Sequence, residues 1–130
     1  MVDFFHLRFT IANWLSFLDP VALASHPLGM SFFITGTDTG VGKTYVTRLV
    51  IASLRAEGRD AVGYKPIACG DRQDAVILAA VSGGLDLDEI NPVHLNTAVA
   101  PYVAGLLENR KVVVAELLAG FHHQIGRAHV

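Results

Sequence analysis

Runs of apolar residues divide the middle of the chain into short structural elements. An apolar, β-branched run over 31–35 predicts a buried strand. Apolar positions then recur every three or four residues over 43–57, and Gly58 follows, which predicts a helix. A second strand is predicted over 61–65, where Pro66 stops it. A strand, a helix and a strand in about 35 residues predict a parallel βαβ unit.

The second half of the chain predicts shorter elements. Helices are expected over 71–81, as a single turn within 85–90, and over 102–107. A loop over 96–100 separates the last two of these. The segment 111–124 fits both a central strand and one face of a helix, and the helix is the favoured interpretation.

The two ends of the chain differ from its middle. Aromatic residues crowd into 1–29, and the favoured interpretation is an over-extended reading frame with Met30 as the true start. A secretory signal, a transit peptide and a short amphipathic helix are the alternatives. The last six residues, 125–130, resemble the translation of a sequencing adapter, with an ordinary helix tail as the alternative. The interpretable domain is therefore expected to be 30–124.

Composition narrows the class of protein. Hydrophobic residues make up 52% and charged residues 17%, which excludes a disordered chain. The net charge of -2 offers no general basis for binding nucleic acid or an anionic membrane. The single cysteine, Cys69, excludes a disulfide framework and suits a reducing compartment. No apolar stretch of about 18 residues is present, so we expect one cytoplasmic globular domain.

Residues 36–44 match the phosphate-loop motif G-x-x-x-x-G-K-[ST] in full. Glycines allow the backbone to curl so that successive N–H groups point at phosphate oxygens. A lysine at position 43 reaches the β- and γ-phosphates, and the Thr44 hydroxyl completes the coordination of Mg²⁺. The motif follows a predicted strand and opens a predicted helix, so it predicts binding of a nucleoside triphosphate. The expected nucleotide-binding residues in this stretch are Thr39, Gly40, Val41, Gly42, Lys43, Thr44 and Tyr45.

Two segments together resemble dethiobiotin synthetase. Residues 35–44 read TGTDTGVGKT and residues 63–70 read GYKPIACG. The resemblance implies an α/β fold of three layers, with the parallel sheet of a P-loop NTPase. It also implies an ATP-dependent cyclo-ligase of biotin biosynthesis, which makes dethiobiotin from 7,8-diaminononanoate and CO₂ and is a homodimer at full length. Because it covers only the N-terminal half of such an enzyme, over 30–124, we expect the fragment itself to be inactive.

The resemblance also assigns roles to single residues. Lys65 and Lys43 become catalytic, and Thr39 lines the site of the diamine and its carbamate. At the carboxyl edge of the second predicted strand, Lys65 would neutralise charge that builds up during phosphoryl transfer. Cys69 stands where the family commonly has a substrate-contacting serine, so this contact is in doubt because a thiol is the weaker donor. An inert, half-buried thiol is the alternative for Cys69.

Asp74 resembles the aspartate that supports Mg²⁺ and nucleotide in this family. A carboxylate opposite Thr44 would supply the hard oxygen donor that Mg²⁺ requires. Asp71 is the competing candidate, since it could instead serve as a helix N-cap with Asp74 in the first helical turn. The loop over 96–102 resembles the substrate-side loop of the family, without assignment of atoms.

Other readings of the same chain remain open. Glu116 follows an apolar run, which is where many phosphate-loop sites have an acidic residue. We instead place Glu116 in the helix over 111–124. His122 and His123 are then expected to be solvated near the end of that helix. A partition-type ATPase switch would carry a signature lysine where Asp38 stands. The remaining alternatives are an amidating synthetase of cobalamin precursors and a non-catalytic domain of similar fold.

Overall fold

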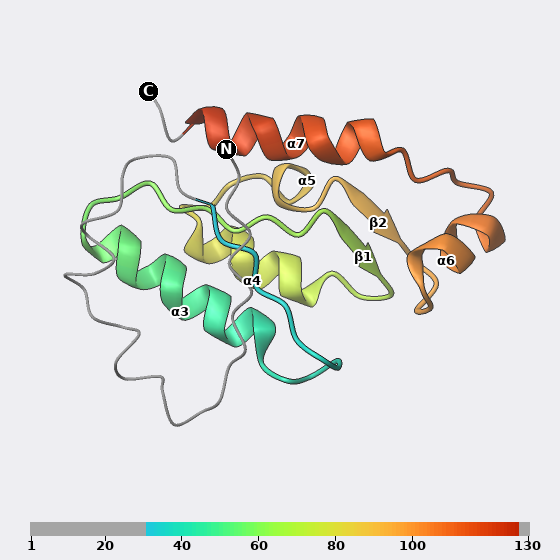
Figure 1. The fold of residues 1–130 in the computed structure, drawn as a ribbon, viewed down its shortest axis with the longest axis horizontal. Coiled ribbons are helices and arrows are strands. Elements are labelled where there is room, and N and C mark those ends of the chain that lie inside the picture. The colour runs from blue at the N-terminus through green and yellow to red at the C-terminus, as the bar shows by residue number, and fades with distance from the viewer. Residues whose placement is uncertain (1–30, 128–130) are drawn as a thin grey trace.

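The computed structural model describes residues 31–127. Two short strands lie between helices, with α7 along one side of the strands and α3 and α4 on the other (Figure 1). In chain order the elements are α3 (Lys43–Ala56), β1 (Ile67–Cys69), α4 (Gln73–Val81), α5 (Leu87–Ile90), β2 (Val93–Leu95), α6 (Pro101–Leu107) and α7 (Val114–Arg127).

The two strands form a parallel pair. Ile67 lies opposite Val93, and Cys69 lies opposite Leu95. The chain passes from β1 to β2 through α4 and α5, which makes the connection a βαβ crossover. The α/β class with parallel strands is therefore confirmed, but the described βαβ unit spans 67–95 instead of the expected 31–65.

The apolar core consists of two clusters. The first cluster joins α3 to α4 and α5 and contains Ile51, Ala75, Leu78, Ala79 and Ile90. The second cluster surrounds β2 and contains Val93, Leu95 and Ala104, with Ile67 and Leu117 packed against it. Asn91 follows the last member of the first cluster and precedes the first member of the second, so the chain crosses between the cores at this residue.

The predicted strand over 31–35 is wrong for the described structure. These residues are irregular and mostly exposed, and Phe33 is 76% accessible to solvent. A strand needs a neighbour to pair its N–H and C=O groups, and no strand lies beside this segment among the residues that the structure describes. An apolar run alone does not supply that neighbour.

The predicted strand over 61–65 is also misplaced, because β1 begins only after Pro66. Two backbone groups of this segment bond to partners outside any sheet. The Gly63 N–H donates to Ser82 Oγ over 2.9 Å, and the Lys65 N–H donates to the Ile90 carbonyl over 2.8 Å. The segment is thus anchored to the ends of α4 and α5.

The helices of the sequence prediction are confirmed. α5 begins with a capping box in which the side chain of Asp86 and that of Glu89 each bond the other residue's backbone. α6 starts at Pro101, whose ring suits the first helical turn. α7 confirms the helical interpretation of 111–124, and it contains Glu116 in its first turn. The short strand β2 was not predicted.

Several expectations about the chain ends stay predictions. Residues 1–29 lie outside the described part of the chain. The helix α7 continues through Gln124 to Arg127, so 125–127 extend a regular element, while 128–130 are again outside the description. Within residues 31–127, no helix has the length and apolar character needed to cross a membrane.

Candidate active site

The phosphate-loop motif forms a tight loop ahead of α3. The chain turns through left-handed φ values of 72° at Gly40 and 90° at Gly42, which glycine adopts without steric cost. The Lys43 ammonium donates a hydrogen bond to the Asp38 backbone carbonyl, which joins the end of the loop to its first half. The predicted loop and the helix that follows it are both confirmed, and the N-terminus of α3 turns its partial positive charge toward the loop.

Three predicted site residues meet just beyond this loop. The Lys65 Nζ lies 3.0 Å from Asp74 Oδ2, and the Thr44 side chain also hydrogen-bonds the Asp74 carboxylate. Thr44 comes from the first turn of α3, Asp74 from the first turn of α4, and Lys65 from the segment ahead of β1. One carboxylate therefore connects the phosphate loop to the Gly-Tyr-Lys-Pro segment.

The charge of Asp74 is stabilised by its neighbours. Burial alone would raise the pKa of this carboxyl group. The hydrogen bonds from Lys65 and Thr44, together with the positive charges of Lys65 and Lys43, outweigh burial and hold the pKa below its ordinary value. Asp74 is thus an anionic oxygen donor at neutral pH. The competing residue, Asp71, instead accepts a hydrogen bond from the Gln73 N–H over 3.0 Å.

The position of Lys65 corrects one expectation. The sequence places this lysine at the carboxyl end of a strand, whereas the structure has it two residues before β1 starts at Ile67. The misplacement follows from Pro66, which the sequence pattern identifies as the end of a strand and which in fact precedes one. The Lys65 side chain still reaches α4, where it forms an ion pair with the metal-binding candidate Asp74 that the sequence did not predict.

The other predicted residues lie around this cluster. The polar contacts of Thr39 are both to the Asp38 carboxylate, with its N–H at 2.7 Å. Val41 and Tyr45 are exposed, and the guanidinium of Arg48 lies 5.2 Å from the centre of the Tyr45 ring. Cys69 is half-buried at the end of β1. Burial and the negative charge of Glu108 raise the pKa of its thiol, against a lowering effect of Lys65, so the thiol is protonated at neutral pH.

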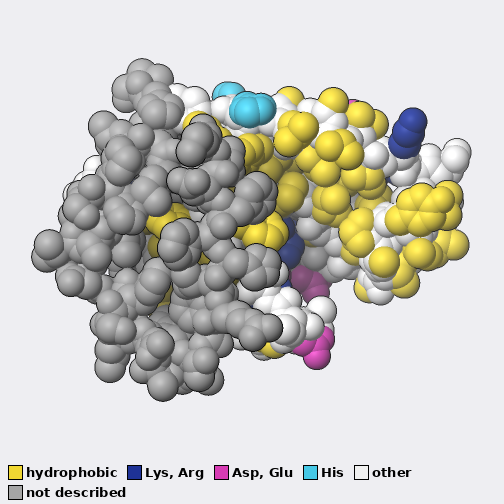
Figure 2. All heavy atoms as spheres, in the orientation of Figure 1, with side chains coloured by type: hydrophobic (Ala, Val, Ile, Leu, Met, Phe, Trp, Pro, Cys, Tyr) yellow, Lys and Arg dark blue, Asp and Glu magenta, His cyan; other side chains and the backbone are white. Residues whose placement is uncertain are grey.

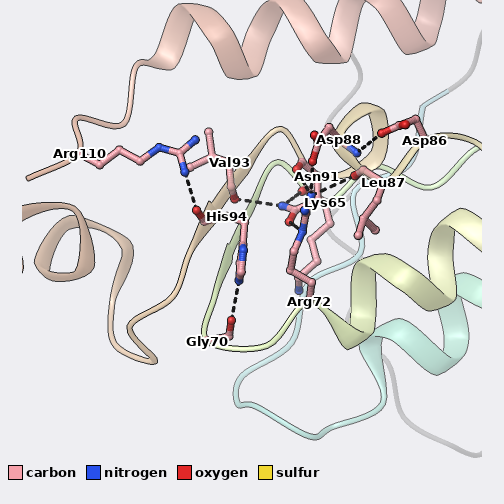
Figure 3. Close-up of polar contacts among 10 residues, drawn as sticks. All are labelled: Lys65, Gly70, Arg72, Asp86, Leu87, Asp88, Asn91, Val93, His94 and Arg110. Carbon is pink, nitrogen blue, oxygen red and sulfur yellow. Dashed lines mark hydrogen bonds and ion pairs between the residues drawn. The ribbon is translucent and has the colours of Figure 1, made fainter. Parts of the chain in front are cut away.

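The sequence analysis did not identify a group of polar residues that bond to the backbone around Lys65 and β1 (Figure 3). Asn91, which is fully buried, bonds the backbone of Lys65, and Arg72 bonds Asn91. At the other end of β1, the ring of His94, which comes from β2, donates to the Gly70 carbonyl over 2.6 Å. The only signal for Asn91 in the sequence is its place before Pro92, which is typical of an ordinary turn.

The donor set is suited to a magnesium ion that also binds a nucleotide. The hydroxyl of Thr44 and the carboxylate of Asp74 are hard oxygen ligands, and they are in contact with each other. Magnesium at such sites takes few ligands from the protein and the rest from water and phosphate oxygens. No group of three or more His, Cys, Asp or Glu side chains gathers into a metal cage within residues 31–127.

Known proteins are similar to the part of the chain that contains this site. The sequence model of a family described as AAA domain matches residues 30–125. A protein of Akkermansia muciniphila named ATP-dependent dethiobiotin synthetase BioD is 59% identical over 83 residues, which cover 63% of this chain and 39% of that protein.

Two further relatives carry the same name. The protein of Marinobacter nauticus is 42% identical over 100 residues, covering 70% of this chain and 42% of its own length. The protein of Xylella fastidiosa is 38% identical over 109 residues, covering 77% and 48%. The resemblance inferred from 35–44 and 63–70 is thereby confirmed, and the chain spans less than half the length of these relatives.

Proposed function

The chain belongs to the family described as AAA domain, and from its similarity to proteins named ATP-dependent dethiobiotin synthetase we propose that it is the nucleotide-binding part of such an enzyme. Its substrates are then ATP, CO₂ and 7,8-diaminononanoate. The observation that carries the proposal is the 3.0 Å contact of Lys65 with Asp74 beside Thr44. A second lysine, outside the phosphate loop, thus lies beside the two groups proposed to hold magnesium, which supports a role for it in phosphoryl transfer.

The proposed reaction has three steps. One amine of the substrate adds to CO₂, loses a proton and forms a carbamate. A carbamate oxygen attacks the γ-phosphorus of ATP, breaks its bond to the bridging oxygen and releases ADP, which gives a carbamic–phosphoric anhydride. The second amine attacks the carbonyl carbon, inorganic phosphate leaves with the electron pair, and loss of a proton completes the ring.

The residues of the chain act mainly through position and charge. Lys43 binds the β- and γ-phosphate oxygens, and Lys65 stabilises the negative charge that builds up on carbamate and phosphoryl oxygens. Thr44 and Asp74 would hold the magnesium ion, which supplies charge neutralisation on the phosphates when it is bound. Cys69 and Thr39 face the substrate side in this proposal, and the thiol gives a weaker hydrogen bond there than a hydroxyl would.

The proposal is tested by an activity assay on the full-length protein. We expect dethiobiotin to form only with ATP, bicarbonate and the diamine together, as measured by mass spectrometry. Lys65→Met is expected to reduce the rate by about 10²–10³-fold, in the range measured for loss of one electrostatic donor. Lys111→Met is the matched control, since this lysine lies outside the site. Product formation that continues without ATP, or unchanged rates in Lys65→Met, would contradict the proposal.

A further inference from the structure

We infer that Asn91 and Arg72 are positioning residues, which together hold Lys65 in register with Asp74. The inference rests on the proposed function insofar as Lys65 acts on the reacting groups. Neither Asn91 nor Arg72 belongs to the phosphate-loop motif or to the Gly-Tyr-Lys-Pro segment. Asn91 lies between α5 and β2, and the side chain of Arg72 reaches it from the start of α4 (Figure 3).

Asn91 is a buried polar side chain with all of its amide hydrogens in use. Its exposure is 0%, and its Nδ2 donates to the Lys65 carbonyl over 2.7 Å and to the Val93 carbonyl over 3.1 Å. Its Oδ1 accepts from Arg72 Nε over 3.0 Å. A fully buried amide that bonds in this way fixes its partners, because breaking any one bond leaves an unsatisfied buried group.

The backbone of Lys65 is held on both sides by the same turn. Its N–H donates to the Ile90 carbonyl over 2.8 Å, and its carbonyl accepts from Asn91. Pro66 follows and restricts Lys65 to extended backbone conformations. The Cα of the lysine is therefore fixed relative to residues 90–91, and the remaining freedom is that of its side chain.

Arg72 connects this turn to the helix that carries Asp74. Arg72 is the N-cap residue of α4, two positions before Asp74. Its guanidinium donates to the side chain and the carbonyl of Asn91, to the Leu87 carbonyl over 3.3 Å, and to Asp88 Oδ1 over 2.8 Å. Arginine suits such a site because its five N–H groups form a rigid fork.

The contacts form a closed ring. The ring leads from the Lys65 side chain to Asp74, along the first turn of α4 to Arg72, across to Asn91, and back to the Lys65 backbone. A closed ring constrains both ends of the lysine at once, so the Nζ of Lys65 is held where Asp74 and Thr44 meet. A purely structural turn would stabilise the fold without fixing that atom.

The test measures the chemical reactivity of Lys65 in the chain itself. The chain has lysines only at positions 43, 65 and 111. Trace acetylation with acetic anhydride, followed by peptide mass spectrometry, gives the ratio of labelling at Lys65 to labelling at Lys111 in the same molecule. Asp74→Asn, which removes the ion-pair partner directly, serves as the positive control. Arg72→Met and Asn91→Ala are the test variants.

A matched control variant is available in Arg55→Met. Arg55 also pairs with an aspartate, Asp60, over 2.8 Å, and also bonds a backbone carbonyl, that of Ala61. Neither of these bonds involves Asn91. We expect the labelling ratio to rise about two- to fivefold in Arg72→Met and Asn91→Ala, as in Asp74→Asn, and to stay unchanged in Arg55→Met, because a partly exposed ion pair accounts for a change of that size.

Circular dichroism of each variant separates loss of positioning from loss of fold. If Asn91→Ala unfolds, Arg72→Met decides the question, since the Arg72 side chain is partly exposed and keeps its stem as methionine. A folded Arg72→Met protein whose labelling ratio equals that of the unsubstituted chain, while Asp74→Asn raises it, overturns the inference. The assay uses no nucleotide and no diamine, so its outcome is independent of whether the proposed reaction occurs.

Discussion

The hydroxyl of Tyr64 donates a hydrogen bond to the Leu117 carbonyl over 2.8 Å, across 53 positions of sequence. The ring also lies against Phe121, with a centroid separation of 6.2 Å. Burial of this phenol raises its pKa, so the hydroxyl remains a donor throughout the neutral range. The residue next to Lys65 thereby ties α7 to the segment that carries the site.

Tyr64→Phe is expected to reduce the free energy of unfolding by about 0.5–1.5 kcal/mol, the usual net contribution of one hydrogen bond. The Leu117 carbonyl loses its side-chain partner, while the ring contact is retained. Urea unfolding followed by circular dichroism measures the change. Tyr102→Phe is the matched control, since Tyr102 is 77% exposed and the same atom is removed there. An equal effect of the two substitutions would show that the Tyr64 bond contributes nothing.

Protonation of Asp74 is expected to reduce the stability of the protein in acid. Its pKa in the folded chain lies below the ordinary value of 3.8, so its contribution to stability is complete above that value and is lost as the pH falls through the lower, folded pKa. Asp74→Asn should therefore flatten the decrease in stability between about pH 5 and pH 2, measured by thermal unfolding at each pH. Asp60→Asn, at the ion pair with Arg55, is the control. A steeper acid limb in Asp74→Asn would contradict the assignment.

Glu108 is expected to hold the loop before α6 in place. Its carboxylate accepts from the Thr97 N–H over 2.7 Å and from Asn96 Nδ2 over 3.5 Å. These bonds, led by the one from the Thr97 backbone, lower the pKa of Glu108. In Glu108→Ala, we expect the Thr97 amide to exchange faster with solvent than in the unsubstituted chain. The control is Glu57→Ala, and unchanged exchange at Thr97 would exclude a role for the carboxylate.

The surface near α6 is expected to promote self-association. Exposed apolar side chains gather there and on the start of α7 (Figure 2). They are Tyr102, Leu106, Leu107, Val114 and Leu118. Replacing two of them, in Leu106→Glu with Leu107→Lys, should raise the monomer fraction measured by light scattering after gel filtration, because contiguous apolar surface drives association. Ala52→Glu with Ser53→Lys, at two exposed positions of α3, is the control, because it introduces the same two charges away from the apolar surface. An equal change of the monomer fraction in both double variants would contradict a role of the apolar surface in self-association.

The chemistry of the site could be predicted to a greater degree than its geometry. The phosphate loop is identified by spacing alone, since the glycines and Lys43 must occur in that order to bind phosphate. Asp74 is found because it resembles the aspartate that supports Mg²⁺ and nucleotide in dethiobiotin synthetases, and because it lies in the first turn of a predicted helix. Local residue order encodes both features, and the structure brings these residues together.

The positions of the strands could not be predicted in the same way. The run over 31–35 has the composition of a buried strand, but strand formation depends on a partner that local sequence does not describe. Pro66 can either follow a strand or precede one. The sequence pattern places the strand before Pro66, whereas β1 begins after it. Asn91 escapes notice because its bonds reach Lys65 and Arg72, 26 and 19 positions away, whereas its local sequence is that of a turn.

The division of the core into two clusters has a consequence for how the chain opens. The cluster around α3 and α4 has five buried members and the cluster around β2 and α6 has three. Cooperative units with less buried apolar contact open at lower free energy in native-state hydrogen exchange. The amides of β2 and α6 should therefore lose protection in a partial opening that leaves α3 and α4 intact. Because Asn91 lies where the chain crosses between the two clusters, that opening would release Lys65 from its register without unfolding the phosphate loop.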